Sequence, residues 1–237
     1  MEEAYQIFSY LPLRYKSNEE DEYIQYLWKA FVNNYQNEQY QFAFMSYHML
    51  FMCFVYFTIW KIKSIQPDDY SKVLLGFHTC LETATSPFGF SEEQERKIMR
   101  IFRFWNITSQ QLKTYKELID DRNNIAHANG NIFYKDEQSI DEKISDMLKA
   151  CEEIQAKTKD TIEQSYVNFL SDNYSLDDSP YSTVEEMLNE EYTQKFYISK
   201  KDISICCNYN IVKLSKRINY ESIHNIHHDI MELNKEE

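Results

Sequence analysis

Apolar residues recur every three or four positions along most of this chain, which is the spacing of helices that bury one face. The chain has 237 residues but only 3 glycines and 4 prolines, which disfavours an all-β or loop-rich fold. We therefore expect an all-α protein, built as an antiparallel helical bundle. The helices are predicted at 18–36, 38–63, 70–84, 91–105, 109–128 and 138–171.

Three of these segments begin with the sequence of a capping box, in which a Ser or Thr is followed three residues later by Glu or Gln. The pairs are Ser17 with Glu20, Ser91 with Gln94, and Thr108 with Gln111. At the other end of 109–128, Asn129 and Gly130 are residues that tolerate the left-handed conformation in which helices often stop.

The segment 42–60 holds 19 consecutive residues without a charge, a length at the lower edge for a membrane span. Polar residues such as Ser46 and Thr58 interrupt it, and the sequence has no second span. A helix that is apolar all round is also required at the centre of a soluble bundle or at a dimer interface. We expect a core helix without a membrane partner, and a membrane-associated protein remains an alternative. His48 and His78 are expected to be hydrogen-bonded core histidines.

The segment 138–171 carries a narrow apolar stripe with charged flanks, which predicts a long helix that covers the bundle or pairs with another helix. The polar stretch 172–182 follows and contains Pro180, so it is the candidate linker. We therefore divide the chain into a bundle, 1–171, and a small C-terminal appendage, 183–237. The appendage is ambiguous between helices and strands in its middle, and we expect helices.

Cysteine and histidine spacing gives one incomplete zinc pattern and no other sign of a cofactor or metal site. Five cysteines without a CxxC pair suggest a reducing cytoplasm, and the acidic N-terminus lacks the basic segment of a secretory signal. No glycine-rich phosphate loop occurs. Glu221, His224 and His228 share a helix face at a spacing able to bind zinc, but a further strong ligand is missing. We expect neither metal nor cofactor.

The segment 109–128 ends with Arg122, Asn123 and, five positions after the arginine, His127. At about 100° per residue Asn123 and His127 share a face, whereas Arg122 and His127 point about 140° apart. A regular helix therefore does not direct the arginine and the histidine at one point. The arginine stem swings round, the helix distorts at its end, or two chains pool their residues.

These residues resemble the R-x4-H motif of HEPN-domain ribonucleases, and the resemblance covers about residues 20–171. It implies an all-α bundle that dimerises to form a composite cleft and cleaves RNA without a metal. Arg122 would stabilise phosphate charge, His127 would transfer protons, and Asn123 would bind phosphate or orient the histidine. The product would carry a 2′,3′-cyclic phosphate. The family association further implies a prokaryotic toxin or defence effector, controlled by an antitoxin or sensor protein.

A noncatalytic alternative stays open, because short motifs recur by chance. In that alternative Arg122 pairs with Glu117 or Asp121, and His127 is a residue favoured at the helix end by the dipole. The protein would then be a HEPN-like interaction or regulatory module.

The net charge of −13 is unevenly distributed along the chain. Residues 136–193 hold 16 acidic and 4 basic residues, whereas 96–122 hold 7 basic and 3 acidic residues. Arg96, Arg100 and Arg103 lie on one helical face in this basic stretch. We expect them to bind the RNA backbone, the alternative being a solvated charged face.

Overall fold

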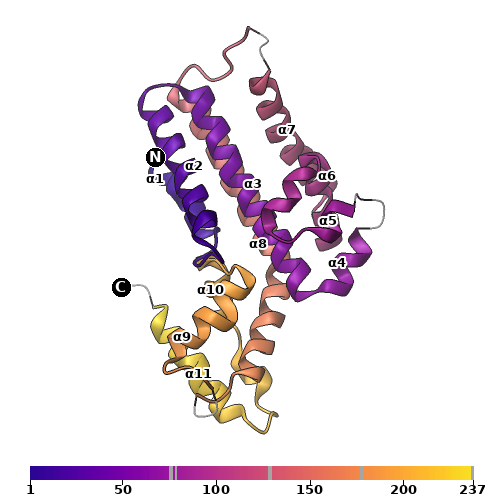
Figure 1. Cartoon of the computed structure of the whole chain (residues 1–237), viewed down its shortest axis with the longest axis vertical. Helices are drawn as coiled ribbons and strands as arrows, with labels where there is room; N and C mark the ends of the chain where they lie inside the picture. The colour runs from indigo at the N-terminus through magenta and orange to yellow at the C-terminus, as the bar shows by residue number, and fades with distance from the viewer. Residues whose placement is uncertain (75–76, 78, 128–129, 177–178, 236–237) are drawn as a thin grey trace. The chain divides into compact units, whose positions relative to one another are not determined.

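The computed structural model describes residues 1–74, 77, 79–127, 130–176 and 179–235, with only the backbone at Thr79 and Cys80 (Figure 1). All regular structure in these ranges is helical, apart from one isolated β-bridge between Pro12 and Ser199. The predicted all-α class is therefore confirmed. Contacts divide the chain into two compact units.

The first unit consists of Met1–Phe8 and Ser17–Lys157. Short 3₁₀ segments occur at Pro87–Glu92 and Ile101–Trp105, and another, Gln6–Ser9, follows the first helix. The α-helices of this unit are α1 (Glu2–Tyr5), α2 (Asn18–Gln36), α3 (Tyr40–Ile65), α4 (Pro67–Val73), α5 (Thr79–Thr83), α6 (Glu95–Arg100), α7 (Ser109–Ala126) and the first part of α8 (Glu137–Asp172).

Helix α3 forms the centre of the first unit, and α2 runs beside it (Figure 1). Phe51, Val55 and Ile59 are fully buried, and the rings of Phe31 and Tyr47 join α2 to α3 at 5.1 Å between centroids. By length and hydropathy α3 could cross a membrane, yet 78% of its most apolar window is buried inside the protein. The core of the bundle thus accounts for its composition.

Helix α8 buries the apolar stripe that its sequence predicts, and its acidic flanks also contact the bundle. The Tyr35 hydroxyl lies 2.8 Å from a carboxylate oxygen of both Glu137 and Asp141. The Tyr115 hydroxyl donates to Glu153 at 2.7 Å. Part of the acidic segment is therefore structural, since these hydrogen bonds hold α8 against α2 and α7.

The second unit consists of Ser9–Lys16 and Thr158–Glu237. The expected helical appendage is confirmed, because α9 (Val184–Leu188), α10 (Lys200–Cys207) and α11 (Tyr220–Leu233) follow the end of α8. A π-helical turn at Asn189–Gln194 and a 3₁₀ turn at Ile211–Leu214 connect them. The segment 9–16 joins this unit through a bond from the Leu13 amide to the Ile198 carbonyl, 2.9 Å.

The contacts divide the chain at a different place from the predicted linker. The division falls between Lys157 and Thr158, inside α8, and segment 9–16 belongs to the C-terminal unit. A continuous helical pattern carries no mark of such a boundary. The predicted linker, 172–182, does follow the end of α8, although residues 177–178 lie outside the described range.

Helix bounds follow the sequence where side-chain caps form and depart from it elsewhere. Ser17 and Thr108 both cap their helices. The helix predicted at 91–105 is wrong in its first part: Ser91 lies in a 3₁₀ turn, and α6 begins only after Gln94, which makes no side-chain cap. Within the predicted helix 70–84, residues 75, 76 and 78 lie outside the described range, and so does Asn129 after α7.

Candidate active site

Helix α7 positions the Arg122 motif, and its start is firmly defined. Thr108 accepts a hydrogen bond from the Gln111 amide while the Gln111 side chain accepts one from the Thr108 amide, which completes the predicted capping box. Tyr115, Leu118 and Ile119 are buried against the bundle. This packing fixes the rotation of α7 and therefore the direction in which Arg122 leaves it.

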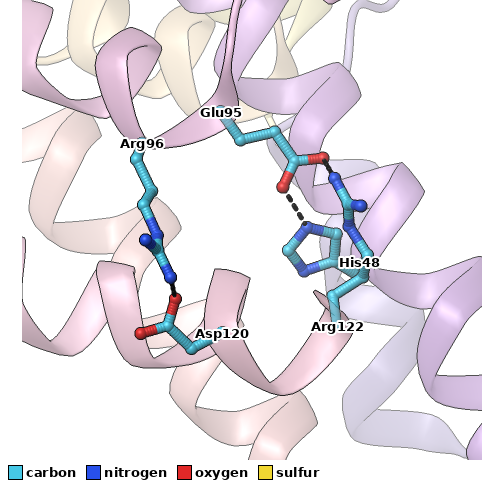
Figure 2. Close-up of polar contacts among 5 residues, drawn as sticks. All are labelled: His48, Glu95, Arg96, Asp120 and Arg122. Atoms are coloured by element: carbon cyan, nitrogen blue, oxygen red, sulfur yellow. Dashed lines mark hydrogen bonds and ion pairs between the residues drawn. The ribbon is translucent and has the colours of Figure 1, made fainter. Parts of the chain in front are cut away.

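The Arg122 guanidinium is bound to the carboxylate of Glu95, which comes from the first turn of α6 (Figure 2). The other carboxylate oxygen of Glu95 lies 3.1 Å from Nε2 of His48 on α3. His48 is fully buried, as predicted for a hydrogen-bonded core histidine. Three helices thus meet in a chain of Arg122, Glu95 and His48.

Glu95 is ionised in this arrangement. Its burial raises the pKa of the carboxyl, but the bonds to His48 and Arg122 lower it more, so the net pKa lies below the usual range. With Glu95 ionised, the imidazole of His48 donates its Nε2 proton, which is our assignment of the tautomer. Nδ1 of His48 has no hydrogen-bond partner among the described residues.

Neighbouring acidic residues of α7 make further ion pairs to other helices. Arg96 binds Asp120, so that consecutive residues of α6 hold α7 at two points (Figure 2). On the opposite side Lys143 of α8 lies 2.9 Å from Asp121. The expectation that a structural Arg122 would pair with Glu117 or Asp121 is wrong, since its partner is Glu95 on another helix.

His127 and Asn123 have less defined surroundings than Arg122. His127 is the C-cap of α7, is exposed, and has extended backbone angles, φ −95° and ψ 138°. The structure therefore ends the helix at the motif histidine, one residue after Ala126. Asn123 is half-buried. Within the described residues, neither side chain is joined to Arg122 by a hydrogen bond.

Arg122 and Glu95 line a cavity of about 750 Å³ in the first unit. Its walls are largely apolar, formed by methionines of α3 together with Tyr23, Tyr56 and Phe88. His127 and Asn123 are not among its lining residues. Within one chain, the structure therefore places Arg122 at this cavity and does not bring His127 to the same point.

The structure does not place the three arginines predicted to bind RNA at one site. Arg100 and Arg103 line a second cavity of about 540 Å³, together with Lys97. Arg96 is bound to Asp120 and does not line this cavity. Arg96 is held on α7 by its ion pair with Asp120, whereas Lys97, Arg100 and Arg103 follow one another at intervals of three residues and reach the same cavity.

Sequence reasoning missed Glu95, the residue that fixes Arg122. The sequence of 91–105 predicts a single helix with several charged residues, and nothing in the pattern distinguishes Glu95 from the others. A pair 27 positions apart needs tertiary contact to be found. One signal was available: if Arg122 were partly buried it would need an acidic partner, and Glu95 lies in the preceding predicted helix.

An arginine and a histidine are side chains that can act on a phosphate group, but within one chain Arg122 and His127 do not meet. Arg122 uses one nitrogen on Glu95 and retains further N–H donors in its planar fork. His127 offers an exposed imidazole. No three His, Cys, Asp or Glu residues in the described part of the chain are grouped to hold a metal ion. Of the residues at zinc-like spacing on α11, His228 lies 3.7 Å from Glu232.

Comparisons with protein-family models, with curated proteins and with solved structures each find no match for this chain. The structure by itself defines the class: an all-α helical protein in which Arg122 of α7 forms an ion pair with Glu95.

Proposed function

We propose that this protein is a HEPN-type endoribonuclease that cleaves RNA without a metal, and that it acts as a prokaryotic toxin or defence effector. The observation that carries the proposal is the motif in its helical setting. Arg122 and Asn123 lie near the end of a capped helix in an all-α bundle, and His127 is the C-cap at which that helix stops. The resemblance requires this setting for the motif.

The proposed chemistry uses the nucleophile that RNA itself carries, its 2′-hydroxyl. His127 accepts the hydroxyl proton, the 2′-oxygen forms a bond to phosphorus, and the bond from phosphorus to the 5′-oxygen breaks. The leaving 5′-oxygen takes up a proton from water, and the proton that His127 accepted neutralises the resulting hydroxide. Arg122 stabilises the charge on the phosphate oxygens, and the products are a 2′,3′-cyclic phosphate and a 5′-hydroxyl.

A homodimer is part of the proposal, because one chain does not bring Arg122 and His127 together. The first unit exposes a group of apolar side chains beside the start of α3: Phe42 is 59% exposed and Ile132 is 66% exposed. The Phe133 amide donates to the Gln41 side chain at 3.1 Å, which holds 132–133 next to Phe42. Such a patch is typical of an interaction surface.

Sedimentation of the wild-type protein and of Phe42→Asp tests this surface. We expect a wild-type dimer and a folded, monomeric variant, because a charge at the centre of an apolar interface is costly to bury. Tyr26→Asp, a matched change at a residue 68% exposed on α2, serves as the control and stays dimeric.

The proposed cytoplasmic location rests on free thiols. Among the described residues Cys53, Cys151, Cys206 and Cys207 are all free. Burial raises the pKa of each, so the thiols stay protonated and unreactive. An antitoxin or sensor partner follows from the family resemblance alone.

The second candidate function is a noncatalytic interaction module. One observation favours it: the Arg122 guanidinium is already neutralised by Glu95, as in a purely structural ion pair. Incubating the purified protein with total RNA in EDTA separates the two candidates. The ribonuclease yields fragments whose 3′ ends carry cyclic phosphate by mass spectrometry, and His127→Ala yields none. Intact RNA after prolonged incubation favours the interaction module.

A further inference from the structure

The cavity at the end of α6 differs in charge from the other cavities of the first unit. Three cationic side chains line it, Lys97, Arg100 and Arg103, and no acidic residue is among its described lining residues. The cavity beside Arg122 is lined instead by four glutamates and a single arginine. On a chain of net charge −13, this concentration of positive charge points to an anionic ligand.

Two of the three cations keep their charge available. Arg100 makes no ion pair with any described residue, and Arg103 donates from Nη1 to the neutral Ser109 hydroxyl at 2.8 Å. Lys97 is different, since its Nζ lies 3.1 Å from Glu93. Arg100 and Arg103 are therefore the main anion-binding groups, with Lys97 beside them.

An aromatic ring stands exposed among these cations. Phe104 is 46% exposed and lines the same cavity, as does Phe77. The 3₁₀ segment Ile101–Trp105 explains the exposure, because it buries Ile101, Phe102 and Trp105 and turns Arg103 and Phe104 outward. Among the aromatic rings of the described residues, that of Phe104 packs against Trp105 in a T-shaped arrangement, with 5.0 Å between centroids, and close to half of the side chain stays exposed. A face of the ring therefore remains available for stacking.

We propose that this cavity binds single-stranded RNA, with a base stacked on Phe104 and the adjacent phosphates held by Arg100, Arg103 and Lys97. Aromatic rings interleaved with cations are the recurring way to hold single strands, because every base has a face to stack and every nucleotide a phosphate. Duplex RNA does not fit, since its bases already stack on one another. The choice of RNA rests on the proposed function. Arg96 is not part of this site.

Binding by the His127→Ala protein provides the test, because that variant holds RNA without cutting it under the proposed function. The probe is a fluorescein-labelled oligouridylate followed by anisotropy over a salt series. Adding Phe104→Ala weakens binding about tenfold, as expected for loss of one stacked base. Adding Arg100→Gln lowers the slope of log affinity against log salt by about 0.7, the share of one phosphate contact on a single strand.

Matched variants separate a binding role from a folding defect. Phe104→Tyr keeps a stacking face and restores binding. Tyr26→Ala removes an exposed aromatic ring from α2, elsewhere in the first unit, and leaves binding unchanged. Arg96→Gln removes the same charge from the same helix, but one already bound to Asp120, and leaves the salt slope unchanged. If Phe104→Ala and Arg100→Gln bind like their parent, the proposal is overturned.

Competitors identify the source of the phosphate. Adenosine monophosphate and inorganic triphosphate compete only weakly with a strand that spans several phosphates, and duplex RNA of the same length binds more weakly than the single strand. Equal competition by triphosphate or by duplex would show a simple polyanion site and overturn the proposal. The proposed ribonuclease activity fails separately: wild-type protein that binds the strand through Phe104 yet leaves it intact would refute cleavage and support this site.

Discussion

Arg122 and His127 belong to one motif, yet they lie in opposite environments. Arg122 is 28% exposed and bound to Glu95, which in turn contacts the buried His48, so three helices determine its position. His127 is exposed at the C-cap of α7, where the helical geometry has ended. The difference shows that one half of the proposed centre is positioned by the fold of a single chain and the other half is not.

The fold therefore constrains Arg122 and His127 in different ways. The position of Arg122 depends on packing and on an ion pair, so changes there affect stability as well as activity. His127 is exposed at the end of α7, so the stability of the fold depends little on its side chain. Substitutions at Arg122 should therefore lower both stability and activity, whereas substitutions at His127 should lower activity alone.

The largest effect is expected at His127. Replacement by alanine removes the proton-transferring group and lowers the rate of RNA cleavage by about 10²–10⁴-fold. Because the side chain is exposed, the free energy of unfolding changes by less than about 0.5 kcal/mol. Single-turnover cleavage and urea denaturation measure the two quantities. A loss of activity that simply follows loss of stability would contradict the proposed role.

Arg122→Ala is expected to affect both quantities. Cleavage is lost with the phosphate-binding guanidinium, and the protein is destabilised by about 1–3 kcal/mol because the partly buried Glu95 loses its partner. Arg122→Lys is the control: it keeps the charge near Glu95 and most of the stability, but lacks the planar fork. Full activity in Arg122→Lys would contradict the role given to the fork.

The pH dependence of stability should reveal Glu95. Its pKa in the folded protein lies below the ordinary value of 4.5, so it stabilises the fold above that value and loses this contribution as pH falls through the lower folded pKa. Glu95→Gln is therefore less stable than wild type at neutral pH, and the difference shrinks as the pH falls below 4.5 and through the lower folded pKa. Urea denaturation across this range checks it, and a constant difference would argue against an ionised Glu95.

The smallest effect is expected at Asn123, which assists and transfers no proton. Asn123→Ala should lower the cleavage rate by only about tenfold or less, because a single neutral hydrogen bond contributes about 1 kcal/mol. Cleavage kinetics beside His127→Ala measure the ratio. A loss as large as that of His127→Ala would make Asn123 a principal member of the centre.

The fold was predictable where one stretch of sequence decides it. Ser17 and Thr108 are caps whose partners lie three residues away, and they fix the starts of α2 and α7. The run from Phe42 to Trp60 is apolar enough to require burial over most of its length, and Phe42 at its start is the exposed exception that leads to the proposed interface. Ser91 failed as a cap because Pro87 and the turn after it form a 3₁₀ segment before α6 begins. Segment 9–16 contacts residues almost two hundred positions away, which no local pattern encodes.

The candidate site was predictable in its residue types and not in its partners. The motif named Arg122 and His127, and the helical angle between them anticipated that one helix would not join them. The bond from Arg122 to Glu95 and the buried contact with His48 depend on how α3, α6 and α7 pack. The cation set changed from Arg96 to Lys97 for a similar reason, since the ion pair of Arg96 with Asp120 depends on how α6 packs on α7.

Mixing two inactive variants tests most directly the central claim, that Arg122 of one chain acts with His127 of another. Arg122→Ala and His127→Ala are exchanged by mild denaturation and refolding, with different tags to confirm mixed dimers. Half the dimers are then mixed, and each keeps one intact pair of two, so cleavage returns to about a quarter of the wild-type rate. A mixture that contains mixed dimers and remains inactive would contradict the claim.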